Sequence, residues 1–163
     1  MTFNKKYKLP NLLNCRICII GLGYVGLPLA IEFSKIKNCL QTKKILNRKV
    51  IGFDLNKERI KQLISGVDLT KEIDDKDKKQ LESIIFVSDI DAHIEADVFI
   101  ISVPTPIDEK NNPDLSYLKN SARSVAKFIK ERKQKTSPIV ILESTVYPGT
   151  CLLYTSDAAD EIT

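Results

Sequence analysis

Three closely spaced glycines inside an apolar stretch constrain this chain more than any other feature. Residues 17–28 read ICIIGLGYVGLP, so Gly21, Gly23 and Gly26 form a G-x-G-x-x-G pattern between a strand-like run and a helix-like run. In such a unit the first glycine permits a tight turn, the second lets the backbone approach a pyrophosphate, and the third lets the helix pack closely. The phosphates then lie at the positive N-terminal end of the helix. The motif therefore predicts a dinucleotide site.

Apolar runs alternate with helical patterns along the rest of the chain. This alternation predicts parallel βαβ units with helices on both faces of the sheet. The expected fold class is α/β, a Rossmann-type doubly wound parallel sheet truncated after about five strands. The expected strands are residues 16–20, 50–54, 84–87, 98–103 and 139–142. The expected helices are residues 24–36, 56–65 and 113–130, with helical potential in the charged segment 68–81 and an inserted polar loop at 38–48.

Composition and charge exclude several classes of protein. The 163 residues suffice for one domain, and 43% hydrophobic with 28% charged residues is ordinary for a globular protein. The net charge of +4 comes from scattered lysines without an aromatic-basic motif, so no nucleic-acid partner is expected. The uncharged stretch 17–31 is shorter than the roughly 20 residues that a membrane helix needs and lacks a signal-peptide cleavage site. No membrane partner is expected either.

The four cysteines, Cys15, Cys18, Cys39 and Cys151, do not form a metal or disulfide pattern. Cys15 and Cys18 are three residues apart at the first strand, where they point to opposite faces. Small buried hydrophobic residues are the better interpretation, no metal site is expected, and reduced thiols favour a cytoplasmic protein. The single histidine, His93, is expected at the surface.

An acidic residue ends the second predicted strand. Asp54 can accept hydrogen bonds from adenine ribose hydroxyls and repel a 2′-phosphate, which favours NAD over NADP. It lies 28 residues after Gly26 instead of about 20, and the inserted loop 38–48 accounts for the excess. A helix-capping carboxylate is the alternative, although Asn56 fills that role better. Arg59 could cover the adenine or meet a phosphate, or could be a solvated helix charge.

Two further segments leave strands at the same edge of the predicted sheet. Residues 103–106 (VPTP) follow the fourth strand and residues 143–149 (ESTVYPG) follow the fifth. Ligands bind at the carboxyl ends of strands in open parallel sheets. The prolines fix rigid turns that aim the hydroxyls of Thr105, Ser144 and Thr145 into the glycine-lined crevice. Simple loop rigidity is the alternative for the first segment.

With these residues in place, the chain resembles the UDP-glucose/GDP-mannose dehydrogenase family. The motifs are residues 21–28 (GLGYVGLP), 52–56 (GFDLN), 103–106 and 143–149. Within the family they are most similar to the branch that oxidises UDP-N-acetylhexosamines, as in Vi and O-antigen polysaccharide synthesis. The resemblance implies oxidation of the sugar C6 alcohol to a carboxylate with two NAD⁺, through a cysteine thioester. Thr145 matches a threonine near the reacting centre. The implied NAD contacts, together with the glycine turn, are Gly21, Gly23, Tyr24, Val25, Gly26, Asp54, Arg59, Thr105 and Thr145.

The chain departs from the family pattern in its catalytic parts. None of its cysteines matches the family's Gly-x-Cys nucleophile, and the catalytic lysine, dimerising helix and UDP-binding domain have no counterpart. The resemblance therefore predicts the NAD-binding half of an enzyme, an N-terminal fragment without turnover of its own. The full-length parent would bind a UDP-sugar and form a homodimer or larger oligomer. A 3-hydroxyacid or 6-phosphogluconate-type dehydrogenase and a non-catalytic NAD-binding module are the alternatives.

The expected domain boundaries follow from the same motifs. Residues 1–14 are an N-terminal extension, and residues 15–150 form the NAD-binding domain. Residues 151–163 read CLLYTSDAADEIT, which resembles the in-frame translation of a transposase-type sequencing adaptor. This tail is expected to be non-native, and a short divergent C-terminus is the alternative.

Overall fold

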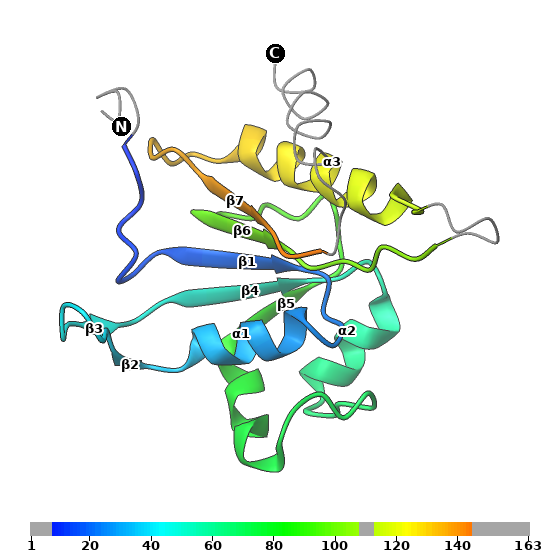
Figure 1. Ribbon diagram of the computed structural model, residues 1–163, viewed down its shortest axis with the longest axis horizontal. Helices are drawn as coiled ribbons and strands as arrows, with labels where there is room; N and C mark the ends of the chain where they lie inside the picture. The colour runs from blue at the N-terminus through cyan, green and yellow to red at the C-terminus, as the bar shows by residue number, and fades with distance from the viewer. Residues whose placement is uncertain (1–7, 108–112, 145–163) are drawn as a thin grey trace.

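The computed structural model describes residues 8–107 and 113–144. A five-stranded sheet lies between helices, and a small two-stranded hairpin projects from one end (Figure 1). In chain order the elements are β1 (Arg16–Ile20), α1 (Gly26–Ser34), β2 (Lys37–Asn38), β3 (Ile45–Leu46), β4 (Lys49–Phe53), α2 (Lys57–Ile64), the 3₁₀ helix η1 (Asp75–Ser83), β5 (Ile84–Val87), β6 (Val98–Ile101), α3 (Ser116–Glu131) and β7 (Ile139–Leu142).

All strands of the main sheet run parallel in the order β5-β4-β1-β6-β7. The first strand, β1, lies at the centre, with Ile19 opposite Gly52 of β4 and Ile100 of β6. The chain builds outward from β1 in one direction and then in the other, so the strand order reverses beside β1. This topology confirms the Rossmann-type prediction and places the ligand-binding crevice at the carboxyl ends of β1, β4 and β6.

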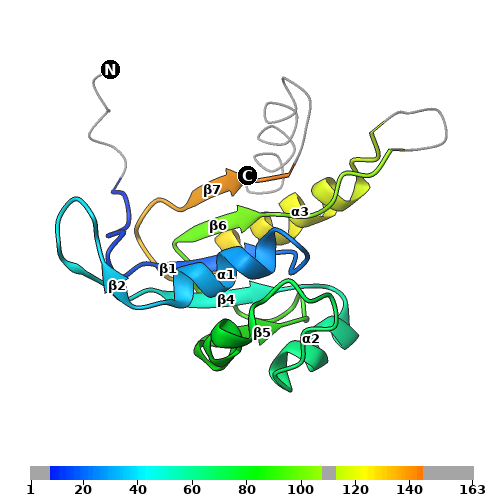
Figure 2. The ribbon, with the colours of Figure 1, turned by 60° about the horizontal axis from the view of Figure 1, so that its bottom comes forward.

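Alternating side chains of β1 divide the core into two layers. Ile17 and Ile19 pack with residues of α1 and α2, whereas Cys18 and Ile20 pack with α3. Figures 1 and 2 show α1 and α2 on one side of the sheet and α3 on the other. In the α3 layer the rings of Phe53 and Phe128 meet edge to face, with centroids 5.3 Å apart. Helices on both faces explain why the strands are continuously apolar.

The connection from β1 to α1 depends on two glycines. Gly21 has a φ of +90°, which a residue with a side chain rarely adopts, and its amide donates to the Phe53 carbonyl at 2.8 Å. A Cβ on Gly26 would overlap the Gly21 carbonyl oxygen and the Ser102 hydroxyl. The helix therefore begins where its backbone touches the turn.

Three predicted helical segments differ from the structure, and the strand predicted at 98–103 ends earlier, at Ile101. The helix predicted at 24–36 is shorter, because residues 23–25 form the turn and the backbone becomes extended at Lys35. In place of an α-helix in the charged segment 68–81, the structure has the 3₁₀ helix η1, which begins only at Asp75 and ends at Ser83. The helix predicted from Pro113 begins at Ser116, since Pro113 pairs with Ile107 in an isolated β-bridge.

The prediction that residues 38–48 form a loop was wrong in part. Its ends pair as the antiparallel strands β2 and β3. The turn between them is closed by hydrogen bonds of Cys39 with Lys44 and Lys43, and Lys43 has a positive φ of 57°. Hairpin turns with positive φ usually contain glycine or asparagine. Because a lysine takes this conformation here, the sequence did not indicate a hairpin, and the segment was predicted as a loop.

Within the described residues β7 is an edge strand of the sheet, and we expect the chain to self-associate through it. Val140 and Ile141 are 50% and 36% exposed, and the strand carries no charge to block pairing. Val140→Lys should shift the protein towards monomer in sedimentation velocity. Ile85→Lys, on the opposite edge strand β5, is the control and should have a smaller effect. A wild type that stays monomeric across the concentration range would contradict the prediction.

We also expect Gly26→Ala to destabilise the fold by about 1–3 kcal/mol, because the new Cβ meets backbone that has no room to move. Gly23→Ala is the matched control, since a Cβ there would meet nothing within 4 Å. Its unfolding free energy should stay within about 0.5 kcal/mol of the wild type. Chemical denaturation measures both, and equal losses would show that close packing at Gly26 is unimportant.

Candidate functional site

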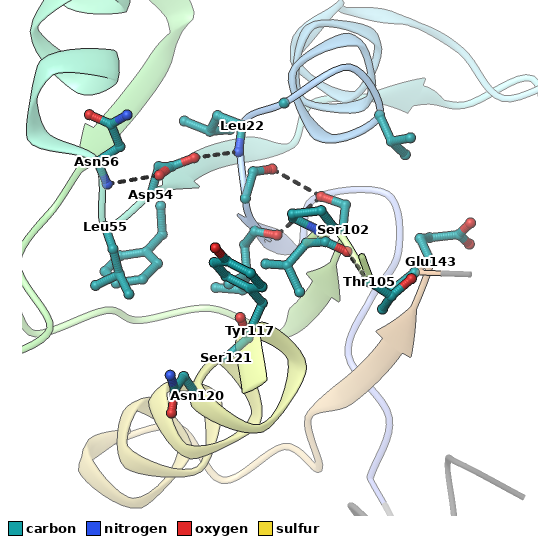
Figure 3. A pocket seen from close by; sticks show the side chains of 18 of the residues that line it. Leu22, Asp54, Leu55, Asn56, Ser102, Thr105, Tyr117, Asn120, Ser121 and Glu143 are labelled. Carbon is teal, nitrogen blue, oxygen red and sulfur yellow. Dashed lines mark hydrogen bonds between the residues drawn. The ribbon is translucent and has the colours of Figure 1, made fainter. Parts of the chain in front are cut away.

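A cavity of about 620 Å³ opens at the carboxyl ends of β1, β4 and β6. Its wall consists of residues 20–25, residues 53–56 after β4, residues 102–105 after β6, four residues of α3, and Glu143 with Ser144. Figure 3 shows Asp54 and Leu55 on one side of this cavity and Thr105 with Glu143 on the other. The cavity therefore lies where ligands bind in a doubly wound sheet, outside the carboxyl ends of the strands.

The glycine turn lines the cavity and fits a phosphate-bearing ligand. A Cβ on Gly23 would project into open space, so the backbone is bare at this point. The turn leads directly into α1, whose N-terminus carries the positive end of the helix dipole. The Ser102 hydroxyl fixes the turn from β6, at 3.1 Å from the Ile20 carbonyl oxygen and 2.9 Å from that of Gly21. A bare, rigid backbone beside a helix N-terminus suits a pyrophosphate.

Asp54 lies half-buried at the carboxyl end of β4 and is tied to the backbone on both sides. Its Oδ2 accepts from the Leu22 amide at 2.8 Å, and its Oδ1 accepts from the Asn56 amide at 2.9 Å. A carboxylate has about four acceptor positions, so capacity remains for ribose hydroxyls. Asn56 caps α2 by accepting from the amides of Glu58 and Arg59 at 3.1 Å each. The cap predicted for Asn56 is confirmed, and ribose binding by Asp54 stays a prediction.

Arg59 is buried beneath the glycine turn and does not line the cavity. Its Nε donates to the Leu22 carbonyl at 3.1 Å, and its terminal nitrogens bind Asp68 and Thr70 at 2.8 and 2.9 Å. The alternative of a solvated helix charge is therefore wrong, because a buried carboxylate faces the guanidinium. Direct contact of Arg59 with a cofactor stays a prediction.

The buried carboxylate of Asp68 remains charged. Burial acts to raise its pKa, but the hydrogen bonds from Thr70, Arg59 and the Glu72 amide outweigh burial, and the pKa lies below its ordinary value. Asp68 therefore stays ionised at neutral pH and faces the guanidinium as a full charge.

The loop after β6 brings one predicted hydroxyl to the cavity. Thr105 lies half-buried in the cavity wall. Next to it the Ser144 hydroxyl donates to the Val103 carbonyl at 2.6 Å and joins the loops after β6 and β7. Thr145, predicted to contact the cofactor and to lie near the reacting centre, is outside the described residues.

Sequence reasoning missed the contribution of α3. Tyr117, Asn120, Ser121 and Ser124 line the cavity at helical spacing i, i+3, i+4 and i+7. Ser121 and Ser124 are buried. Two serines among the apolar positions of this amphipathic helix could have indicated the cavity. Small polar residues on a buried helix face leave space beside them.

Cys15, Cys18 and His93 lie where the sequence predicts, whereas Cys39 is half-buried and Cys151 is outside the described residues. Cys15 and Cys18 are buried in opposite layers, and burial raises the pKa of both thiols. Cys39 lies on the β2–β3 hairpin, at the far end of the sheet from the cavity (Figure 1). His93 is at the surface, 2.9 Å from the Glu95 carboxylate.

Two kinds of feature are absent from residues 8–107 and 113–144. These segments contain no cluster of three metal-ligating side chains. Within the same segments, no helix has the length and hydrophobicity to cross a membrane.

Comparison with known proteins identifies the family. The sequence profile of the UDP-glucose/GDP-mannose dehydrogenase family, NAD binding domain, matches residues 15–161. A UDP-N-acetyl-D-glucosamine 6-dehydrogenase of Pseudomonas aeruginosa is 42% identical over 134 residues, which cover 82% of this chain and 28% of the relative. Protein CapL of Staphylococcus aureus is 41% identical over 137 residues, which cover 84% of this chain and 28% of the relative.

Solved structures agree with the sequence comparison. The UDP-D-ManNAc dehydrogenase of Pyrococcus horikoshii superposes with a TM-score of 0.70 at 31% identity, over 90% of this chain and 32% of that one. The chain thus spans about a third or less of the length of these relatives. Its sequence match, its strand order and the placement of its glycine turn show that the chain belongs to the UDP-glucose/GDP-mannose dehydrogenase family, of which it carries the NAD-binding domain.

Proposed function

We propose that this chain is the NAD-binding part of a nucleotide sugar dehydrogenase that oxidises C6 of a UDP-N-acetylhexosamine. The observation that carries the proposal is the cavity in which the bare backbone at Gly23 lies close to the Asp54 carboxylate. These groups suit the two ends of an adenosine diphosphate, its phosphates and its ribose. The substrate class is supported by relatives whose names give UDP-N-acetyl-D-glucosamine as substrate.

The residues of this chain would bind and orient the cofactor. The turn from Gly21 to Gly26 holds the pyrophosphate, and Asp54 accepts from the adenine ribose while it disfavours a 2′-phosphate. Thr105 lies at the opposite wall, and in the proposal Thr145 contacts the cofactor as well. Bound NAD⁺ supplies the hydride acceptor for oxidation of the alcohol.

The three cysteines that the structure describes support the proposal that the covalent step needs residues beyond this chain. Cys15 and Cys18 are buried thiols with raised pKa values, which disfavours the nucleophilic thiolate. A hydrogen bond from Thr42 lowers the pKa of Cys39, but this residue lies far from the cavity. In the proposal, a full-length parent supplies the nucleophile, the lysine and the UDP-sugar site. That parent is a homodimer or larger oligomer. Cys15, Cys18 and Cys39, the cysteines that the structure describes, are free thiols, which suits the cytoplasm.

We expect Asp54→Asn to weaken NAD⁺ binding by about 1 kcal/mol, a roughly fivefold rise in Kd, because the carboxylate loses one acceptor for the ribose. The wild type should prefer NAD⁺ to NADP⁺. The variant should narrow that preference, because it no longer repels a 2′-phosphate. Calorimetric titration with both nucleotides measures the change.

Glu82→Gln is the matched control for Asp54→Asn. It removes the same charge from an exposed position at the end of η1, and it should leave both affinities unchanged. Unchanged NAD⁺ affinity in Asp54→Asn would overturn the ribose assignment. Failure of the wild type to bind NAD⁺ would overturn the proposed function of this chain.

We further expect no NADH when this chain is incubated with UDP-N-acetylglucosamine or UDP-N-acetylgalactosamine and NAD⁺. The reason is that no thiol of the described residues lines the cavity. The full-length Pseudomonas aeruginosa relative, assayed in parallel by NADH absorbance, is the positive control. Sustained NADH formation by this chain would contradict the assignment of catalysis to residues beyond it.

A further inference from the structure

The peptide groups on either side of Leu22 are held by two side chains from another part of the chain. The Leu22 amide donates to Asp54 at 2.8 Å, and its carbonyl accepts from Arg59 Nε at 3.1 Å. Leu22 stands between Gly21, which has a positive φ, and Gly23, whose backbone is bare towards the cavity. The orientation of these peptides therefore sets which backbone groups point into the cavity.

Arg59 is itself held in one orientation. Its Nη1 binds Asp68 Oδ1 at 2.8 Å and its Nη2 binds Thr70 Oγ1 at 2.9 Å. A guanidinium is planar and rigid, so two fixed terminal nitrogens also fix the direction in which Nε donates. Only 8% of the Arg59 side chain is exposed, which leaves little water to compete for these donors.

Asp68 anchors this arrangement and has all its acceptor positions filled. Its Oδ1 accepts from Arg59 and from the Thr70 hydroxyl at 2.8 Å each. Its Oδ2 accepts from the amides of Glu72 and Ile73 at 2.6 and 3.0 Å. The carboxylate is 1% exposed, and the segment between α2 and η1 folds around it. Loss of its charge would leave the buried guanidinium without this negatively charged partner.

The fold of α2 has other supports. Asn56 caps the helix, and Ile60 and Leu63 bury its apolar face in the core. Arg59 lies on the same buried face of α2 as Leu63, and its Nε donates to the Leu22 carbonyl. The ion pair of Arg59 with Asp68 thus connects α2 and the segment after it to the glycine turn.

We propose that Asp68, which lies outside the cavity, is a positioning residue for the dinucleotide site, because it orients Arg59 so that Nε fixes the Leu22 carbonyl. The proposal rests on the proposed function in one respect, namely that the cavity binds NAD⁺. Asp68 contacts no ligand in this scheme. It acts through Arg59 on the backbone that receives the pyrophosphate.

Asp68→Asn tests the proposal, because it keeps the size of the side chain but removes its charge and one acceptor oxygen. We expect Kd for NAD⁺ to rise about tenfold, as for loss of a charged hydrogen bond. In the ligand-free chain, the amides of Leu22 and Gly23 should exchange with deuterium faster, while those of Phe99 and Ile100 in β6 keep their protection. A purely structural role would accelerate exchange at both places.

Two further variants keep the test decisive if Asp68→Asn folds poorly. Arg59→Lys retains a positive charge opposite Asp68 but loses the Nε donor to Leu22, and it should reproduce the faster exchange and the weaker binding. The double variant should lose no more NAD⁺ affinity than either single variant, because both act through one contact. Asp75→Asn removes the same charge at a site whose side chain is 93% exposed, and it should change neither measurement.

The outcomes separate the two proposals. Wild-type exchange at Leu22 and Gly23 in both Asp68→Asn and Arg59→Lys would overturn the positioning role, whether or not the chain binds NAD⁺. Additive losses in the double variant would overturn it as well. Absence of NAD⁺ binding by the wild type would overturn the proposed function, and the exchange comparison would still decide the role of Asp68.

Discussion

The close approach of two backbone segments, at Gly26 and the Gly21 carbonyl, is the constraint on which the rest of the structure depends. A side chain at Gly26 would push α1 away from the end of β1 and from Ser102, the residue that follows the neighbouring strand β6. With no side chain there, the helix begins directly at the turn, and its positive end faces the crevice where the strand order reverses. The absence of a side chain at Gly26 thus fixes how the helix, the turn and the cavity are placed relative to each other.

The amide and the carbonyl of Leu22, in the middle of the turn, are bound by two side chains that follow β4 in the sequence. Asp54 holds the amide of Leu22 and Arg59 holds its carbonyl. A turn with bare backbone towards solvent has few contacts of its own, so these buried bonds supply its rigidity. In our proposal Asp54 also binds the ribose. The same carboxylate would then shape the phosphate site and select the nucleotide, and substitutions at Asp54 would affect both.

Much of the architecture could be predicted from local patterns. The strands at 84–87 and 139–142 coincide with β5 and β7, and the cap at Asn56 is confirmed. The errors lie where the local pattern is ambiguous. The β2–β3 hairpin turns through a lysine with positive φ, and η1 is a charged segment in which helix type depends on packing against α1 and α2. The cavity-lining serines of α3 were missed because apolar periodicity describes a buried face without showing what lies beside it.

The sequence by itself determined the parallel α/β architecture, the glycine turn and the family. These follow from periodicity, from glycine sterics and from motifs, all of which are properties of short segments. Only the tertiary structure decided that Arg59 lies beneath the turn, bound to Asp68 and to a carbonyl 37 residues away. A charged residue on a helix has the same local pattern whether it faces water or a buried carboxylate. The choice depends on how the segment after α2 folds back, which is a long-range contact that no local pattern contains.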